Sequence, residues 1–431
     1  MKFIFRLIVL LGIVFFALPP ASCRREPAHY RGEALPVDSL FEDLGKADRE
    51  RRAAMAEAAF TTMHRTLGLN GAVLYAEGGQ VLYEQAFGWR DLKRRQIPLH
   101  TSDTFQLASV SKMFTAEAIM LLHAQGKLSY DDDLQRYLPE FPYRGITLRH
   151  LLNHRSGLSR YESLADEHWP DRGVPLHNDD MVQLFQKHRP DPYFEPDADF
   201  HYNNVNYALL ANVVERVSGQ HFEDFMKENV FEPLGMHHSY IYSLRGVGRL
   251  GLYTDTGVQG YDLYRSGPQR VQEDYLNGVV GDKVMYSTVE DLYRFSVALE
   301  THQLLPDSIQ REAFLPSSET WKHGDNYGFG WRMSQRHPGI VYHFGWWKGY
   351  RSFFIIDRPH ERVLIILTNT SSSAPATPPG TSSQTPRYSC LPPVPCRPVR
   401  QSLTINLKPT PWTLTRSTFG SSLKYLRSLV I

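Results

Sequence analysis

Residues 72–85 read AVLYAEGGQVLYEQ, in which two aliphatic and aromatic runs stand on either side of Gly78 and Gly79. Two glycines between such runs are typical of a tight β-hairpin, because the favoured turn needs positive φ at its central positions. A second hairpin is predicted late in the chain, where residues 352–357 (SFFIID) and 362–368 (RVLIILT) flank a short segment with a proline. The sequence therefore predicts strands near both ends of a globular body.

Between the hairpins the apolar residues recur with the three- to four-residue spacing of helices. Together with a helix that precedes the first hairpin, the predicted helices are Ser39 to about Leu67, 109–125 ending near Gly126, 205–217 ending near Gly219, and Thr288 to about Leu299 with Ser287 and Glu290 as a capping box. This order predicts an α+β fold. In it an antiparallel sheet, built from both ends of residues 39–370 and flanked by helices, carries an inserted all-helical lobe at roughly 110–240.

The N-terminal segment has the pattern of an export signal. Residues 1–23 have a positively charged start, an apolar run from Leu7 to Leu18, and small residues before Cys23. The segment resembles a bacterial lipoprotein signal, although Pro20 stands where a leucine-like residue is usual. We therefore expect an exported protein of the periplasm or cell envelope, lipid-anchored to the membrane at Cys23, with residues 24–38 as a tether. An uncleaved membrane anchor is the alternative.

The C-terminal segment, residues 371–431, is rich in Ser, Thr and Pro, and no Asp or Glu follows Glu361. Such a composition cannot bury enough apolar surface to offset the entropy of ordering the chain. We expect this tail to be disordered, or to come from a shifted reading frame.

The composition narrows the class of protein. Hydrophobic residues make up 42% of the 431 residues and the net charge is +1, which suits a globular protein and does not suit a nucleic-acid binder. The three cysteines, Cys23, Cys390 and Cys396, all lie outside the body, so the body has no disulfide, thiolate metal site or cysteine nucleophile. His150 and His154 have the spacing of a zinc pair but lack the glutamate of the metalloprotease pattern. We expect no metal and no cofactor, and the oligomeric state stays open.

A reactive pair is one interpretation of residues 107–116, LASVSKMFTA. Ser109 and Lys112 are three apart, so a helix would place them on one face. A lysine buried among apolar residues loses hydration of its ammonium, so its pKa should fall toward neutrality and it could take the serine proton. The alternative is a solvated helix face, because Ser-x-x-Lys also occurs by chance.

Two later segments add weight to the reactive pair. Tyr202 and Asn204 lie just before a predicted helix, where a phenol can act as a general base and an amide can donate to a substrate carbonyl or to the lysine. In the third segment His343, Phe344 and Gly345 begin a predicted strand, His343 can donate to this network, and Trp346 can offer its backbone N–H as an oxyanion donor. Each residue alone could equally be structural.

The three segments together resemble the serine β-lactamase and penicillin-binding protein family, which carries Ser-x-x-Lys, Tyr-x-Asn and a third motif of the type His-x-Gly. The class C-like branch is most similar. The resemblance implies that Ser109 is acylated, that Lys112 activates it, and that Tyr202 serves as base. It also implies that Asn204 orients the substrate. Phe344 departs from the family, because a hydroxyl residue normally stands there and helps to hold a substrate carboxylate.

The resemblance implies an exported serine hydrolase that cleaves an ester or amide bond of a small-molecule or peptide substrate through an acyl-enzyme on Ser109. D,D-peptidase, esterase and β-lactamase activities stay open. The alternative from another class is a protein that binds or senses penicillin or cell-wall peptide without turnover. A third reading is the non-functional product of a damaged gene.

Overall fold

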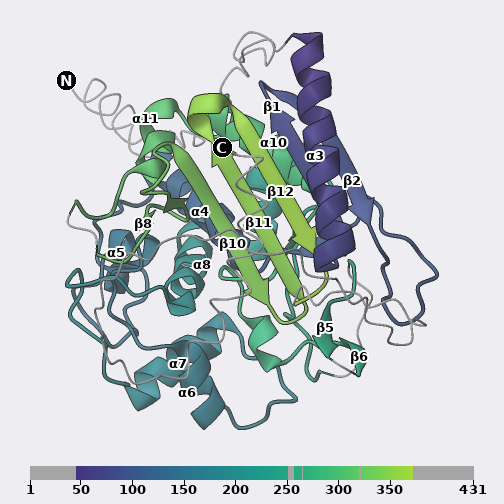
Figure 1. Cartoon of the computed structure of the whole chain (residues 1–431). Coiled ribbons are helices and arrows are strands. Elements are labelled where there is room, and N and C mark those ends of the chain that lie inside the picture. The colour runs from purple at the N-terminus through teal and green to yellow at the C-terminus, as the bar shows by residue number, and fades with distance from the viewer. Residues whose placement is uncertain (1–44, 251–256, 265, 320–321, 372–431) are drawn as a thin grey trace, which may run out of the picture. The chain divides into compact units, whose positions relative to one another are not determined.

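The computed structural model describes residues 45–250, 257–264, 266–319 and 322–371. Its centre is a seven-stranded antiparallel sheet in the order β2-β1-β12-β11-β10-β9-β8 (Figure 1). The strands are β1 Gly71–Glu77, β2 Gln80–Phe87, β8 Asn326–Tyr327, β9 Arg332–Met333, β10 Ile340–Trp347, β11 Tyr350–Asp357 and β12 Arg362–Thr368. The predicted α+β fold, with an antiparallel sheet flanked by helices, is confirmed.

Both predicted hairpins are present. Gly78 and Gly79 join β1 to β2 with φ of 57° and 70°, which are the positive values that made this turn predictable. A short 3-10 turn, Arg358–His360, joins β11 to β12, and its proline lies in the first turn.

The pairing of β1 with β12 joins the two ends of the domain. Gly71 lies opposite Thr368, and the register continues without a break to Glu77 opposite Arg362. The N-terminal hairpin thereby becomes one side of a sheet whose remaining strands all come from the C-terminal part. The expectation that both ends of the body build one sheet is correct.

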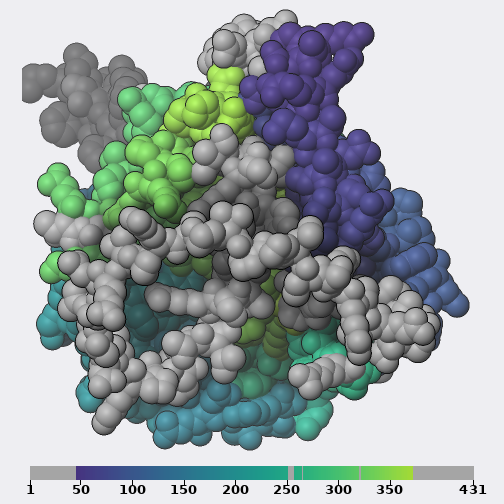
Figure 2. Space-filling model, in the orientation of Figure 1, coloured from purple at the N-terminus to yellow at the C-terminus, as the bar shows by residue number. Residues whose placement is uncertain are grey.

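Strand β1 is buried on both faces because its side chains alternate between two cores. Val73 and Tyr75 pack against helix α3, Lys46–Leu67, together with Phe60 of that helix. Leu74 and the β1 residues two positions before and after it, Ala72 and Ala76, face the other way and pack in the main core. The predicted first helix is therefore present from Lys46, and residues 39–44 lie outside the described residues. Figure 2 shows α3 in purple along one side of the molecular face.

Most helices lie between the two hairpins. They are α4 Ser111–Ala124, α5 Leu148–Leu152, α6 Tyr161–His168, α7 Asn178–His188, α8 Asn204–Ser218 and α9 Phe222–Met226, which continues as a π-helical turn, Lys227–Phe231. Gly126 follows α4 with φ of 67°, and Gly219 caps α8 with φ of 74°. Both predicted glycine stops are present, because only a residue that tolerates positive φ ends a helix in this way.

Helix α10, Val289–Glu300, corrects one prediction. Its N-cap is Thr288, whose side chain accepts a hydrogen bond from the Asp291 backbone N–H. The predicted capping box of Ser287 and Glu290 was therefore one residue early. Ser287 instead ends strand β7, Met285–Ser287, and its hydroxyl shares a hydrogen bond with the Ser239 hydroxyl.

Several smaller elements lie outside the central sheet and the helices named above. They are a sheet in the order β3-β7-β4, formed by Phe105–Gln106, Met285–Ser287 and Tyr240–Ile241, a hairpin of β5 Tyr261–Tyr264 with β6 Gly267–Arg270, and helix α11 Asp307–Gln310. The export signal with Cys23, the tether and all but the first residue of the tail lie outside the described residues. Within the described ranges, no helix combines the length and apolarity that crossing a membrane requires.

Candidate active site

Ser109 lies in a strained turn directly before helix α4. The turn is a 3-10 helix, Ala108–Val110, so Ser109 precedes the α-helix that the sequence led us to expect around it. Ala108 has φ of 48°, which is uncommon for a residue with a side chain and is often found at functional sites. Ser109 is partly exposed, whereas Ala108 and Val110 are buried. The turn therefore leaves the Ser109 side chain partly exposed between two buried residues.

Lys112 is fully buried and directs its amine at three oxygen atoms. Nζ lies 3.1 Å from Ser109 Oγ, 2.8 Å from Asn204 Oδ1 and 2.8 Å from the backbone carbonyl oxygen of Asp282. Three acceptors match the three N–H donors of a protonated lysine. The structure therefore brings the predicted serine and lysine together and adds two supports that hold the amine in place.

Asn204 is the first residue of α8, and Asn203 caps that helix by accepting a hydrogen bond from the Val205 N–H. The Asn204 amide oxygen accepts from Lys112, and its amide nitrogen donates to Glu162 Oε1 at 2.6 Å. Asn204 was expected to donate to the lysine or to a substrate, but in the structure Lys112 donates to Asn204. Glu162 fixes this direction, because a carboxylate only accepts.

Tyr202 lies beside the lysine without a hydrogen bond to it. The Lys112 amine is 5.1 Å from the centre of the Tyr202 ring, and the guanidinium carbon of Arg332 is also 5.1 Å from that centre. The Tyr202 hydroxyl is buried and has no hydrogen-bond partner among the described residues. The ring therefore lies next to two cations, while its hydroxyl is unpaired among the described residues.

Strand β10 runs past the turn that carries Ser109. Its three predicted site residues, His343, Gly345 and Trp346, differ in burial and in the groups that they contact. Gly345 is buried against the turn: a methyl group at this position would lie 2.1 Å from the Leu107 carbonyl oxygen and 3.0 Å from Ala108 Cβ. Trp346 is 61% exposed, so its indole is open to a ligand. The role of its backbone N–H in an oxyanion site stays a prediction.

His343 is buried, and neither of its ring nitrogens hydrogen-bonds to Lys112. Its Nε2 lies 3.1 Å from the Tyr327 hydroxyl, and its Nδ1 lies 2.9 Å from the Phe344 carbonyl oxygen. Burial, with the positive charges of Arg332 and Lys112, holds the pKa of His343 well below its usual range. A neutral ring with both nitrogens engaged positions Tyr327, so the structure does not bring His343 into the hydrogen-bonded group of Lys112.

A second buried lysine next to the site was missed by the sequence analysis. The Lys283 amine lies 3.0 Å from the Asp282 carboxylate and also donates to the Tyr161 hydroxyl. Tyr161 in turn donates to Asp282 at 2.9 Å. Burial raises the pKa of Asp282, while the charges of Lys283 and Lys112 oppose that effect. The sequence VVGDKVMY, residues 279–286, could have indicated this pair. Asp282 and Lys283 lie inside an apolar run, and two charges that are buried must find partners.

The histidine pair that resembles a zinc motif has structural contacts. The His150 ring accepts from the Thr147 N–H in the cap of α5. His154 is fully buried, and its Nδ1 lies 2.9 Å from Asn206 Nδ2. Within the described ranges, no three His, Cys, Asp or Glu side chains are grouped so that they could hold a metal ion.

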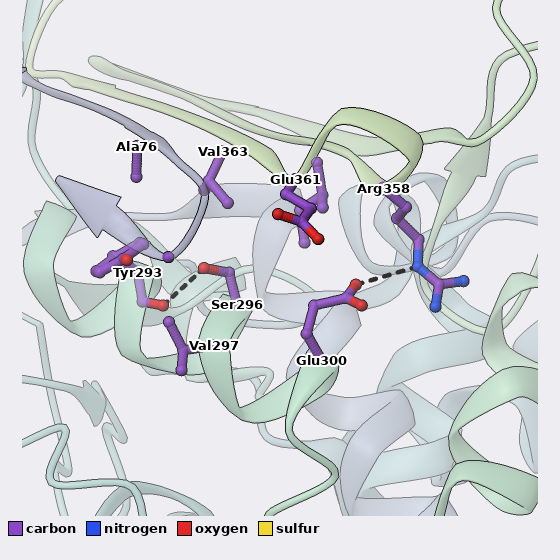
Figure 3. Close-up of a pocket in the computed structure, with 10 residues that line it drawn as sticks. Ala76, Tyr293, Ser296, Val297, Glu300, Arg358, Glu361 and Val363 are labelled. Atoms are coloured by element: carbon purple, nitrogen blue, oxygen red, sulfur yellow. Dashed lines mark hydrogen bonds and ion pairs between the residues drawn. The ribbon is translucent and has the colours of Figure 1, made fainter. Parts of the chain in front are cut away.

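A separate pocket of about 130 Å³ lies between α10 and the ends of the central strands (Figure 3). Figure 3 shows Glu300 and Arg358 at its edge, joined by an ion pair of 3.1 Å. None of its lining residues belongs to the hydrogen-bonded group around Lys112. We therefore place the candidate active site at Ser109 rather than at this pocket.

Known proteins are similar to this chain along most of its length. The sequence model of the family described as Beta-lactamase matches residues 47–382. The chain is 37% identical over 322 residues to penicillin-binding protein 4* of Bacillus subtilis, covering 72% of this chain and 70% of that protein. It is 28% identical over 380 residues to esterase EstB of Burkholderia gladioli, covering 78% of this chain and 95% of the esterase.

The fold comparison gives the same result. The crystal structure of a penicillin-binding protein from Bacillus halodurans superposes with a TM-score of 0.63 at 29% identity, covering 73% of this chain and 95% of that protein. The relatives thus include both a penicillin-binding protein and an esterase on one scaffold.

Proposed function

The chain belongs to the Beta-lactamase family of serine hydrolases, and from that premise we propose that it cleaves an ester or amide bond through an acyl-enzyme on Ser109. The contact of 3.1 Å between Lys112 Nζ and Ser109 Oγ carries this proposal. A serine hydroxyl is a weak nucleophile until a neighbouring base takes its proton, and Lys112 is the base within reach.

The proposed reaction has two steps. Once Lys112 has lost a proton, it accepts the hydroxyl proton of Ser109 as Oγ attacks the substrate carbonyl. The bond to the leaving alcohol or amine breaks, and the leaving group takes up a proton. Water then attacks the acyl-enzyme and releases the acid. The Tyr202 hydroxyl has no hydrogen-bond partner among the described residues. This supports a role for Tyr202 in passing the proton to the leaving group and in activating the water.

The substrate class is proposed from the relatives and from strand β10. The relatives named as a penicillin-binding protein and as an esterase support acyl transfer from an amide or an ester. Phe344 stands where the family usually has a hydroxyl that helps to hold the substrate carboxylate. We therefore favour esters and amides that lack a carboxylate at that place over β-lactams.

A fluorophosphonate probe tests the nucleophile. Wild-type protein should be labelled, and Ser109→Ala should abolish the label. Ser111→Ala is the matched control, because this serine lies two residues further on and its hydroxyl accepts a hydrogen bond from the Met285 N–H. Labelling that survives in Ser109→Ala and vanishes in Ser111→Ala would refute the assignment.

The second candidate function is acylation without turnover, as in a sensing protein. The name of the Bacillus subtilis relative favours it. Steady release of p-nitrophenol from p-nitrophenyl butyrate, over many equivalents of enzyme, selects the hydrolase. A burst that stops at one equivalent selects the sensor.

We also propose that the protein is exported and anchored by a lipid on Cys23, in the periplasm or cell envelope. The basic start, the apolar run Leu7–Leu18 and the small residues before Cys23 support this proposal. Labelling of expressing bacteria with an alkyne fatty acid should mark the wild-type protein and leave Cys23→Ala unmarked. Equal labelling of both proteins, or of neither, would contradict it.

A further inference from the structure

Arg332 is a half-buried cation whose contacts are aromatic rings. Its guanidinium carbon lies 4.9 Å from the centre of the Phe344 ring, 5.1 Å from that of Tyr202 and 5.7 Å from that of Tyr327. Its Nε is buried without a hydrogen-bond acceptor among the described residues. A cation near an aromatic ring is attracted to the π electrons, more strongly where water is excluded. The rings therefore stabilise this charge in place of a carboxylate.

The backbone fixes Arg332 relative to the helix that carries Lys112. Arg332 begins β9 and pairs with Tyr327 of β8. Gly330, in the turn between these strands, packs closely on α4. A methyl group at Gly330 would lie 2.8 Å from Met113 Cα and 3.1 Å from the Lys112 carbonyl oxygen. Arg332 follows two residues later, so α4 sets the positions of both the lysine and the guanidinium.

Tyr202 depends on contacts to its ring, because its hydroxyl has no hydrogen-bond partner among the described residues. It lies in the loop before α8, outside the helix. The His154 ring centre is 4.4 Å away, and burial keeps the pKa of His154 well below its usual range, so this neighbour is uncharged. The Lys112 amine already donates to three oxygen atoms. Arg332 is therefore the neighbouring cation that has the ring as a main partner.

We infer that Arg332 is a positioning residue for Tyr202. Its guanidinium lies between Phe344 of the central sheet and Tyr202 of the helical lobe, and it holds the phenol beside Lys112. This inference rests on the proposed hydrolase function, in which the Tyr202 hydroxyl passes protons. Without the guanidinium the ring can turn or shift, and small displacements of a group that transfers protons are costly.

A double-mutant cycle tests whether Arg332 acts through Tyr202. Hydrolysis of p-nitrophenyl butyrate is measured for the wild-type protein, Arg332→Gln, Tyr202→Phe and the double variant. Arg332→Gln should lower kcat about 10-fold, which is the size of a well-desolvated cation–π contact, and should change KM little. Tyr202→Phe keeps the ring and removes the hydroxyl, so it should lower kcat by about 100-fold or more.

The double variant should match Tyr202→Phe to within about two-fold, because a ring without its hydroxyl has no proton transfer left to misplace. Single-turnover release of p-nitrophenol, with protein in excess over ester, extends the cycle to variants that are slow in the steady state. A double variant about 10-fold slower than Tyr202→Phe would overturn the inference, because independent effects multiply.

A charged substrate separates positioning from substrate contact. Mono-p-nitrophenyl succinate carries a carboxylate that p-nitrophenyl butyrate lacks. Arg332→Gln should lower kcat for both esters by the same factor. A rise in KM confined to the succinate would make Arg332 a substrate contact and overturn the inference.

Arg336→Gln is the matched control, at an exposed arginine of the same segment, and it should behave as the wild-type protein. Circular dichroism should show folded protein in every variant. Wild-type hydrolysis that Arg332→Gln leaves unchanged overturns the inference and leaves the proposed function standing. No hydrolysis of either ester by the wild-type protein counts against both.

Discussion

The carbonyl oxygen of Asp282 accepts a hydrogen bond of 2.8 Å from the Lys112 amine, across 170 residues of sequence. The side chain of the same aspartate is held by Tyr161 and Lys283. The group that positions the lysine is therefore itself fixed by a buried network. Glu162, the residue next to Tyr161, holds the second support of the lysine, Asn204. The first turn of α6 therefore positions both Asp282 and Asn204, the two residues that hold the Lys112 amine.

Tyr161→Phe should lower kcat for a chromogenic ester by about 10-fold, the cost of roughly one hydrogen bond, and change KM little. Its pH–rate profile should shift, since the surroundings of the Lys112 amine change. Tyr264→Phe, at a tyrosine that is 59% exposed, should match the wild-type protein in both measurements. A Tyr161→Phe protein with lower thermal stability but an unchanged profile would make Tyr161 merely structural.

Gly345→Ala should reduce fluorophosphonate labelling at least 10-fold. The added methyl group would lie 2.1 Å from the Leu107 carbonyl oxygen, so the turn that carries Ser109 must move, and small displacements of a nucleophile are costly. Gly248→Ala, at a glycine with nothing within 4 Å of the added carbon, should be labelled normally. Circular dichroism should show folded protein in both variants. Normal labelling of Gly345→Ala would show that β10 can move to accommodate the methyl group without displacing Ser109.

Glu117→Gln should stabilise the protein increasingly as the pH rises. Glu117 is buried in α4, and burial raises the pKa of its carboxyl to about 8, from 4.5 in the unfolded chain. The folded state therefore keeps a proton that the unfolded state loses. Stability is fully present below about pH 4.5 and is lost as the pH rises toward 8, by at most about 1.4 kcal/mol per pH unit.

Urea unfolding of the wild-type protein and of Glu117→Gln at pH 5, 6.5 and 8 measures this effect. The difference in free energy of unfolding should widen with pH in favour of Glu117→Gln. Glu57→Gln, at an exposed position on α3, should show a constant difference. A difference that narrows with pH would contradict the prediction.

His154 should make the protein less stable in mild acid. Burial, helped by the charges of Lys112 and Arg332, holds the pKa of His154 well below its ordinary 6.5. The unfolded chain therefore binds a proton below about pH 6.5 that the folded protein does not bind. The free energy of unfolding falls with the pH in that range, by at most about 1.4 kcal/mol per unit for this histidine.

The slope of unfolding free energy against pH, between pH 5 and 6.5, should be smaller in His154→Gln than in the wild-type protein. His237→Gln, at an exposed histidine, should keep the wild-type slope. The slope is the readout, because replacement of a fully buried ring also lowers stability at every pH. An unchanged slope in His154→Gln would show that His154 is protonated in the folded state.

Local chemistry made much of the fold predictable. Gly78 and Gly79 need positive φ, and Gly219 ends α8 for the same reason, so these positions depend on nothing distant. The predicted cap of α10 was one residue early, because Ser287 with Glu290 and Thr288 with Asp291 form two overlapping capping patterns. Pairing of β7 with its neighbours decides that Ser287 belongs to a strand.

The site was less predictable than the fold. The spacing of Ser109 and Lys112 is local, so their contact could be expected from the sequence. Asp282 and Glu162 reach the site from distant segments, and only tertiary packing brings them there. The 3-10 turn at Ser109 was also not predicted, because a positive φ is uncommon for an alanine and the sequence around Ala108 carries no glycine to indicate it.

The pairing of Gly71 with Thr368 has a consequence for the time at which the protein can fold. A chain growing on the ribosome holds the first hairpin long before β12 has been synthesised, so one side of β1 stays without its neighbour until translation is nearly complete. Contacts so distant in sequence also fold slowly. The pairing of β1 with β12 can therefore form only after Thr368 has been synthesised. A chaperone that covers the unpaired edge of β1 until then would raise the yield of native protein.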